Sequence, residues 1–272
     1  MRPVTAALLV LLMTACASAT PATPRPTEVA AAAPGAPGPA TPGTGQAAPP
    51  AQAEASAPVT VVLDPGHNGG NAAHPAQINR PIPTGRGGTK PCNTTGTSTD
   101  AGYSEHAFAW AVTLDVRDVL SRNGVNVVLT RENDDGVGPC ANDRAGIANQ
   151  AGAAAMVSIH ADGASPGSHG FHVIVADPPL NPSQGAPSTA LAKAVIAALR
   201  SGGFPPSDYT GADGLSPRPD LAGLNFAEVP AVIVECGNMR NPDESAAMSD
   251  SAGRRRYAEA IAAGILAWLA QR

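Results

Sequence analysis

The chain has 272 residues and carries 22 acidic against 17 basic side chains, which gives a formal net charge of −5. This balance gives no reason to expect nucleic acid as a partner, because proteins that bind nucleic acid present basic surfaces to the phosphates. Once an apolar leader and a proline-rich segment are set aside, roughly 215 residues remain, which is a usual size for one domain.

Residues 1–19 have the pattern of a secretory signal peptide, in which a basic residue precedes an apolar run at 6–13 and small residues follow. The run is too short to span a membrane as a mature helix. Two processing sites stay open. Ala17-Ser18-Ala19 suits ordinary cleavage, whereas Met13-Thr14-Ala15-Cys16 loosely resembles a lipoprotein box, in which Cys16 would carry a lipid anchor. Both predict export, to the periplasm or cell-wall space or into the medium.

Residues 20–57 consist mainly of Ala, Pro, Thr and Gly and contain almost no large apolar side chain. Such a segment cannot bury a core, so we expect a disordered tether. The folded domain is therefore predicted at 58–272.

That domain opens with a β-branched, apolar run from Val59 to Leu63, which ends at the turn Asp64-Pro65-Gly66. The run predicts a buried strand with His67 just beyond its end. Residues 68–102 are polar, rich in Gly, Pro and Thr, and have no helical or strand period. Loops of this length in compact domains are usually functional or disordered, so we expect a lid or a loop that faces the substrate.

Apolar residues at helical spacing predict a helix over Glu105–Arg122, with Ser104 as its N-cap and Asn123-Gly124 at its end. Residues 209–226 are expected to be a loop with at most one short edge strand. The other predicted elements are strands at 125–130, 155–160, 170–176 and 231–235, and helices at 143–151, 189–200 and 254–269. This alternation predicts a single α/β domain with a mostly parallel, twisted sheet flanked by helices.

The cysteines of the folded part suggest one disulfide and one free thiol. Cys92 and Cys140 lie in polar loops, and an exported protein permits disulfides, so we predict that they are bridged. Cys236 follows an apolar run and is expected to be a buried thiol. A catalytic role for Cys236 would need an activating histidine, and the histidines have a better use.

Four residues form the candidate site: His67, Glu105, His160 and Glu235. Three of them lie at the carboxyl ends of predicted strands, where ligands bind in open α/β sheets, and Glu105 opens the helix that follows the 68–102 loop. Two histidines and one glutamate suit a catalytic zinc site, in which the fourth position holds water and the metal polarises the carbonyl under attack. Glu235 would then serve as general base for the water and as acid for the leaving amine. The chain has no His-Glu-x-x-His pattern, which argues against a helix-borne peptidase site.

Each of these residues also has a simpler interpretation. A histidine after a strand is often only a hydrogen-bonded turn residue, and Glu105 could be a helix-start carboxylate stabilised by the helix dipole. Glu235 follows four apolar residues, and a buried carboxylate without a partner is costly, which favours a functional role. The remaining histidines are expected in loops, at the surface or at a strand start: His74, His106, His169 and His172.

At several of these positions the chain resembles the zinc-dependent N-acetylmuramoyl-L-alanine amidases, the peptidoglycan amidases of cell separation. The similar stretches are LDPGHNGG around His67, Ser104-Glu105, Thr130-Arg131, RAGIAN from Arg144, SIHAD around His160 and VPAVIVECGN around Glu235. The resemblance implies one Zn²⁺ held by His67, Glu105 and His160, with Glu235 as the catalytic glutamate. It also implies cleavage of the amide that joins the lactyl group of N-acetylmuramic acid to L-alanine of the stem peptide.

The chain departs from the family where Gly237-Asn238 replaces an aromatic residue that commonly follows the catalytic glutamate. Some relatives cover the site with an inhibitory helix, whereas any cover at 68–102 here would be a loop or hairpin. Two other functions stay open: a zinc peptidase or carboxypeptidase acting on wall peptides, and a non-catalytic wall-binding regulator. The expected partners are peptidoglycan or muropeptide fragments, and nothing in the sequence requires more than a monomer.

Overall fold

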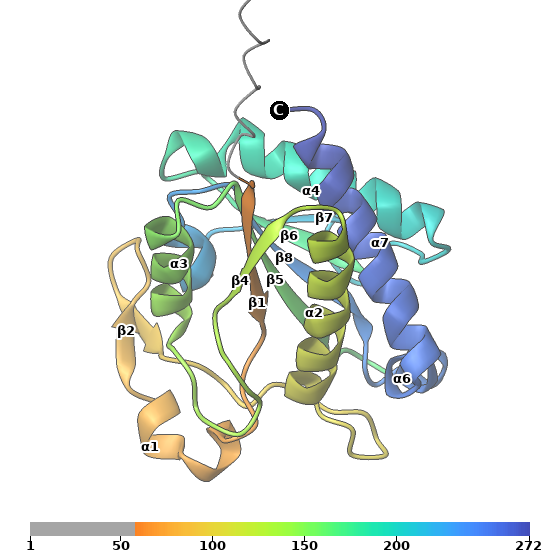
Figure 1. Ribbon diagram of the computed structural model, residues 1–272. Coiled ribbons are helices and arrows are strands. Elements are labelled where there is room, and N and C mark those ends of the chain that lie inside the picture. Colours follow the sequence, from red (N-terminus) through yellow and green to blue (C-terminus); the bar gives the residue numbers. More distant parts are fainter. Residues whose placement is uncertain (1–57) are drawn as a thin grey trace, which may run out of the picture. The chain divides into compact units, whose positions relative to one another are not determined.

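The computed structural model describes residues 58–272, and the segments expected to be a signal peptide and a tether lie outside the described residues (Figure 1). A sheet of six strands, in the order β4-β1-β5-β8-β6-β7, runs through this part of the chain. Its strands are β1 (Thr60–Pro65), β4 (Asn126–Leu129), β5 (Ala155–Asp162), β6 (His172–Ala176), β7 (Leu215–Arg218) and β8 (Ala231–Asn238).

The sheet is mostly parallel, as the sequence predicts. Strand β1 pairs in parallel with β4 and β5, and β5 pairs in parallel with β8. Strand β6 runs antiparallel to β8 and parallel to β7. The reversal follows from the connection between β5 and β6, which contains no helix, because a parallel pairing needs a long crossover segment.

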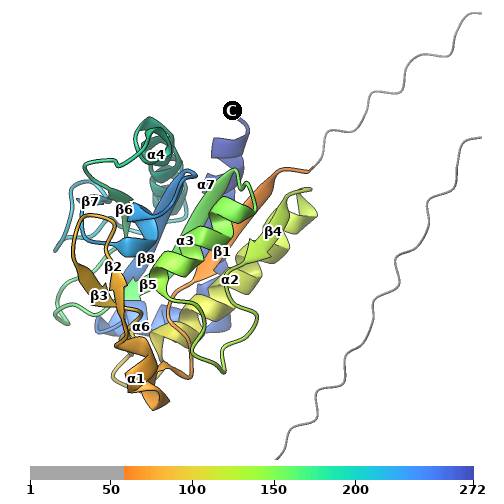
Figure 2. The same ribbon diagram turned by 90° about the vertical axis from the view of Figure 1, so that its left-hand side faces the viewer.

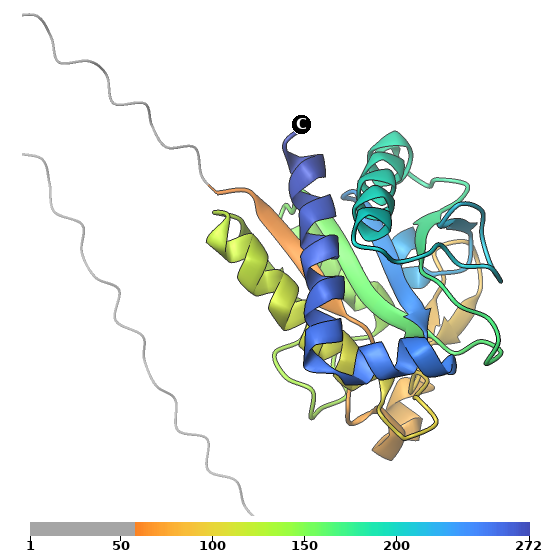
Figure 3. The same cartoon turned by 90° about the vertical axis from the view of Figure 1, so that its right-hand side faces the viewer.

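Helices cover both faces of the sheet. Helices α2, α4 and α7 lie over one face (Figure 3), and α3 lies over the other, together with a small hairpin of β2 (Pro81–Pro83) and β3 (Thr89–Pro91) (Figure 2). The helices are α1 (Pro75–Ile78), α2 (Glu105–Arg122), α3 (Ala141–Gln150), α4 (Ala186–Ser201), α5 (Ala222–Asn225), α6 (Pro242–Ser249) and α7 (Ser251–Leu269). Over residues 58–272, none of them has the length and apolar character needed to cross a bilayer.

Strand alternation decides which residues meet the functional face. In β5, Val157 and Ile159 pack into the larger core beneath α2 and α7, whereas Met156 belongs to the smaller core beneath α3 and α5. Successive side chains of a strand point to opposite faces, so Ser158 and His160 share the face of Met156. This alternation places His160 on the face of the sheet that α3 covers.

The segment 68–102 has more regular structure than the sequence suggests. It contains a 3₁₀ turn, helix α1 and an antiparallel hairpin of β2 (Pro81–Pro83) and β3 (Thr89–Pro91). The predicted disulfide between Cys92 and Cys140 is confirmed, and it joins the end of the hairpin to the start of α3. Strands of three residues that include proline carry no readable period, which is why the pattern did not reveal them.

Other helix boundaries differ by a few residues from the predictions. Helix α3 begins at Ala141 with Cys140 as its N-cap, earlier than predicted. Ser104 is the N-cap residue of α2, but its side chain makes no capping hydrogen bond. Helix α6 was not predicted, and Asp250 caps α7 by accepting hydrogen bonds from two backbone N–H groups. Cys236 is a buried free thiol within β8, as predicted.

Candidate metal centre

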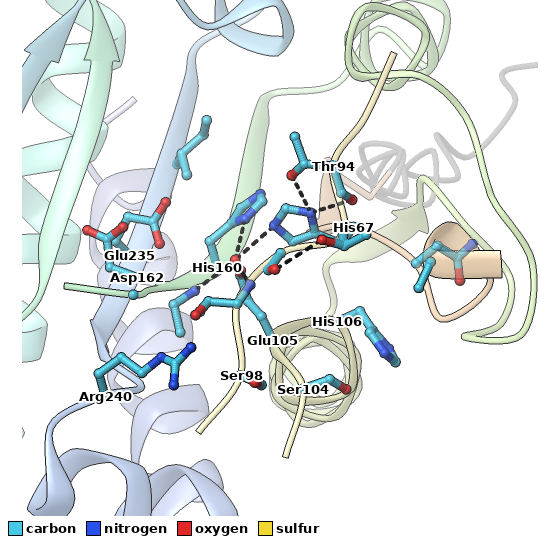
Figure 4. Close-up of a pocket in the computed structure, with 18 of the residues that line it drawn as sticks. His67, Thr94, Ser98, Ser104, Glu105, His106, His160, Asp162, Glu235 and Arg240 are labelled. Carbon is cyan, nitrogen blue, oxygen red and sulfur yellow. Dashed lines mark hydrogen bonds and ion pairs between the residues drawn. The ribbon is translucent and has the colours of Figure 1, made fainter. Parts of the chain in front are cut away.

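Three of the four candidate residues converge on one point at the carboxyl ends of β1 and β5 (Figure 4). The ligand atoms of His67, Glu105 and His160 all lie within 4.8 Å of one another, and they are the one such group found in residues 58–272. Glu105 Oε1 lies 3.0 Å from His67 Nε2 and 2.9 Å from His160 Nδ1. Two imidazole nitrogens and a carboxylate oxygen at this spacing could hold a divalent metal ion.

The backbone at the exit of β1 is shaped for this convergence. His67 has a φ of 57°, in the left-handed region that non-glycine residues rarely adopt, and such conformations cluster at functional sites. A Cβ atom at Gly66 would lie 2.4 Å from the His160 ring, and one at Gly96 would lie 2.7 Å from Glu105 Oε2. Only glycine at these two positions allows the three ligand side chains to approach this closely.

Two buried arginines hold that exit in place. Arg144 donates to the carbonyl oxygens of Pro65 (2.7 Å) and His67 (2.8 Å), and Arg131 donates to the Pro65 carbonyl at 3.0 Å. Arg144 also forms an ion pair of 2.7 Å with Asp64, itself buried. The sequence motifs contain these residues, but their role as supports of the site was missed, since no local pattern links positions some 80 residues apart.

The charge of Asp64 is stabilised by this contact. Burial by itself would raise the pKa of Asp64, but the Arg144 guanidinium and hydrogen bonds from Ser158 and Thr130 outweigh it and lower the pKa to about 2. Asp64 is therefore ionised at neutral pH, and the pair Asp64–Arg144 ties β1 to α3.

Glu105 is likewise held as a carboxylate. Its Oε2 accepts a hydrogen bond of 2.9 Å from the Thr97 backbone N–H, in the segment that precedes α2. Burial acts to raise the pKa of Glu105, but the neighbouring His67 and His160 outweigh burial and lower it. Burial acts to lower the pKa of His67, and Glu105 in turn raises it.

Glu235 lies beside this group but is not tied to it. In the β5–β8 register Glu235 stands directly opposite His160. Its Oε2 atom is buried and has no hydrogen-bond partner. Burial raises the pKa of Glu235 well above its ordinary value, and the negative charges of Glu105 and Asp162 act in the same direction. A buried polar atom without a partner calls for an explanation, and a proton-transfer role supplies one.

The four residues line one pocket of about 660 Å³. His106 also lines it, on α2 and half-buried rather than in a loop, but its Nδ1 pairs with Asp134 at 2.7 Å. His172 is buried on β6 opposite Glu235, while His74 and His169 lie at the surface. Within the described residues, none of these four histidines belongs to the group formed by His67, Glu105 and His160.

An α/β sheet with a His-Glu-His cluster near its strand ends and an unpaired carboxyl beside it is the arrangement expected of a metal-assisted hydrolase. Comparison with known proteins gives the family. A sequence model described as N-acetylmuramoyl-L-alanine amidase matches residues 61–267. N-acetylmuramoyl-L-alanine amidase Rv3717 of Mycobacterium tuberculosis is 47% identical over 212 residues, which cover 78% of this chain and 87% of that protein.

Solved structures agree with this result. The amidase Ami1 of Mycobacterium smegmatis is 50% identical, with a TM-score of 0.77 and coverage of 79% of this chain and 98% of that one. The apo form of Ami1 from Mycobacterium abscessus is 49% identical, with a TM-score of 0.75 and coverage of 78% and 98%. This chain therefore belongs to the N-acetylmuramoyl-L-alanine amidase family, and the resemblance seen in its sequence motifs is confirmed.

Proposed function

We propose that this protein hydrolyses, with one bound Zn²⁺, the amide between the lactyl group of N-acetylmuramic acid and L-alanine of the stem peptide. Family membership supports the choice of bond. The observation that carries the mechanism is the convergence of His67, Glu105 and His160 within 4.8 Å, next to a Glu235 carboxyl without a hydrogen-bond partner. Residues 58–272 would form the catalytic domain.

The donor set fits zinc. Two imidazoles and one carboxylate are ligands that zinc accepts in catalytic sites. The Thr94 carbonyl oxygen lies 3.1 Å from His67 Nδ1 and can only accept, so Nδ1 carries a proton and Nε2 is left to bind the metal. When bound, the zinc would polarise the scissile carbonyl and acidify a water molecule.

Glu235 would transfer the protons of the reaction. As a carboxylate it takes a proton from the attacking water, and as a carboxylic acid it delivers that proton to the amine of the departing L-alanine. Its raised pKa suits it to hold the proton between the two steps. The cluster of His67, Glu105 and His160 would orient the carbonyl against this group.

The disulfide supports an exported enzyme. A bridge such as Cys92–Cys140 persists in oxidising compartments and is rare in reducing ones. We therefore propose action on peptidoglycan or its fragments outside the cytoplasm. The choice between ordinary cleavage and a lipid anchor at Cys16 falls outside the described residues.

The test is mass spectrometry of a defined muramoyl-peptide after incubation with the zinc-loaded protein. An intact stem peptide with a free L-alanine amino group, together with unsubstituted muramic acid, would support the amidase. Shortened stems still attached to the sugar would show a peptidase instead. A fully zinc-loaded sample that releases nothing would favour a wall-binding protein.

A further inference from the structure

The catalytic pocket continues over the sheet, away from the metal-binding cluster. Beyond Glu235 its lining includes Ile233 and Ile174, which stand opposite each other on β8 and β6. Leu221 and Arg218 line the same pocket. By strand register Glu235 stands opposite one end of β6, and Arg218 stands beside the other end. One arm of the pocket therefore has an apolar floor and an arginine at its far end.

Arg218 is oriented by a neighbour and keeps unused donors. Its Nε donates to Asp220 Oδ1 at 2.9 Å and its Nη2 donates to Asp220 Oδ2 at 2.6 Å. Within residues 58–272 the Nη1 group has no hydrogen-bond partner, and 44% of the side chain is exposed. The bonds with Asp220 raise the pKa of Arg218, and the charges of Glu235 and Asp162 add to this effect. The guanidinium thus lies within electrostatic reach of the catalytic carboxyl.

Positive charge exceeds negative charge at this end of the pocket. Lys90 donates to the backbone carbonyl of Asp220 at 2.8 Å. Lys90, Arg86 and Asp220 line an adjoining hollow. Arg218 and Lys90 both act on the Asp220 carboxylate, and Arg86 lines the same hollow. An arginine that keeps free N–H groups beside these cations is well suited to bind a second carboxylate.

The other arm differs in its chemistry. Its wall carries the hydroxyl groups of Thr97, Ser98 and Ser104, and its arginine is Arg240. Arg240 pairs with Asp100 at 2.7 Å, so one cation meets one anion. The side chains of Arg240 and Arg218 are almost equally exposed, at 43% and 44%. A wall of hydroxyl groups whose one arginine is already paired matches an uncharged sugar better than a carboxylate.

We propose that Arg218 is a specificity-determining residue that binds a free carboxylate on the peptide side of the scissile amide. The stem peptide would lie over Ile233 and Ile174, and the glycan would lie toward the hydroxyl-lined arm. This assignment rests on the proposed function. The positive charge of Arg218 supports this assignment. The sugar half of the substrate is neutral. On the peptide side, a glutamate that follows L-alanine and is linked to the next residue through its side chain keeps a free α-carboxylate.

The experiment uses two muramoyl dipeptides that differ in one group. Both carry L-alanine followed by D-glutamate with its γ-carboxyl capped as the methylamide, and the α-carboxyl is free in one and a carboxamide in the other. We expect the zinc-loaded wild-type protein to cleave the acid with a kcat/KM about tenfold above that for the amide, as for a hydrogen bond to a charged group. Arg218→Gln should remove this preference by slowing cleavage of the acid while leaving cleavage of the amide close to the wild-type value.

Arg240→Gln is the matched control, because it removes a similarly exposed and paired arginine from the other arm. Its ratio of acid to amide cleavage should equal that of the wild type. Equal cleavage of the two substrates by the wild type would overturn the assignment, and so would a loss of the preference in Arg240→Gln but not in Arg218→Gln. Either result would leave the amidase reaction standing, whereas failure of the zinc-loaded wild type to cleave either substrate would contradict the proposed function itself.

Discussion

The two sides of the catalytic pocket are built in opposite ways. On the β1 side, His67 and its neighbours are fixed by hydrogen bonds from Arg144 and Arg131, and Asp64 in turn holds Arg144. On the β8 side, Glu235 has a buried carboxyl oxygen without any partner. Metal ligands need a preformed geometry, whereas a group that transfers protons must be free to take and release them. The comparison suggests that the first side sets metal affinity and stability, and that the second sets turnover.

The largest effect should come from removing a ligand. His160→Ala is expected to abolish both zinc retention and hydrolysis, because only His67 and Glu105 would remain to hold the ion. Metal analysis of the purified variant measures the first effect. His106→Ala is the matched control, since His106 lines the same pocket but pairs with Asp134, and it should keep a full complement of zinc. An unchanged zinc content in His160→Ala would refute the ligand assignment.

On the other side of the pocket, Glu235→Gln should separate turnover from metal binding. The amide keeps the shape of the side chain but cannot accept and return a proton, so hydrolysis should fall by about 10²–10⁴-fold. Zinc content and thermal unfolding should stay as in the wild type, because Glu235 lies outside the metal-binding cluster. Retained turnover of a muramoyl-peptide would contradict the proposed role.

The sequence predicts the chemical residues of the pocket better than the residues that support them. Buried strands are recognisable as runs of β-branched and apolar residues, so the strands that carry His160 and Glu235, and the strand that precedes His67, could be located from the sequence. Strands β5 and β8 continue beyond the predicted ends, to Asp162 and Asn238. Their meeting point was predicted because parallel strands end at the same edge of a sheet. The choice of Glu105 as the third ligand had the weakest support in the residues alone, since a carboxylate at a helix start has an equally simple structural explanation, and the family resemblance added to it.

The supports of the site could not be predicted in the same way. Asp64 and Arg144 belong to a strand and a helix 80 positions apart, and nothing local in either element indicates the ion pair. Helix α6 is short and has no apolar stripe of its own, so its residues gave no helical pattern. Strand β6 runs antiparallel to β8 because no crossover helix follows β5. The sequence shows that this helix is missing, but the direction of β6 follows from it only when the strand order of the sheet is known.

The first test of the supporting side concerns stability. Arg144→Met would leave the buried Asp64 carboxylate without its cation, and breaking a buried pair in this way costs about 3–5 kcal/mol in the free energy of unfolding. Chemical denaturation of the disulfide-intact protein measures this cost. Arg117→Met removes an exposed partner of Asp118 and should cost no more than about 1 kcal/mol. Similar losses in the two variants would show that the Asp64–Arg144 pair is not a main support.

The smallest predicted effect is a pH dependence that belongs to the same support. The pKa of Asp64 is about 2 in the folded protein against an ordinary value of 3.8, so the folded state binds the proton more weakly than the unfolded chain. The resulting stabilisation is fully present above pH 4 and is lost as the pH falls toward 2. The difference in unfolding free energy between the wild type and Asp64→Asn should therefore shrink by about 1 kcal/mol between pH 5 and pH 3. Other carboxyl groups titrate in both proteins and cancel in this difference, so a constant value across the range would place the acid sensitivity of the fold elsewhere.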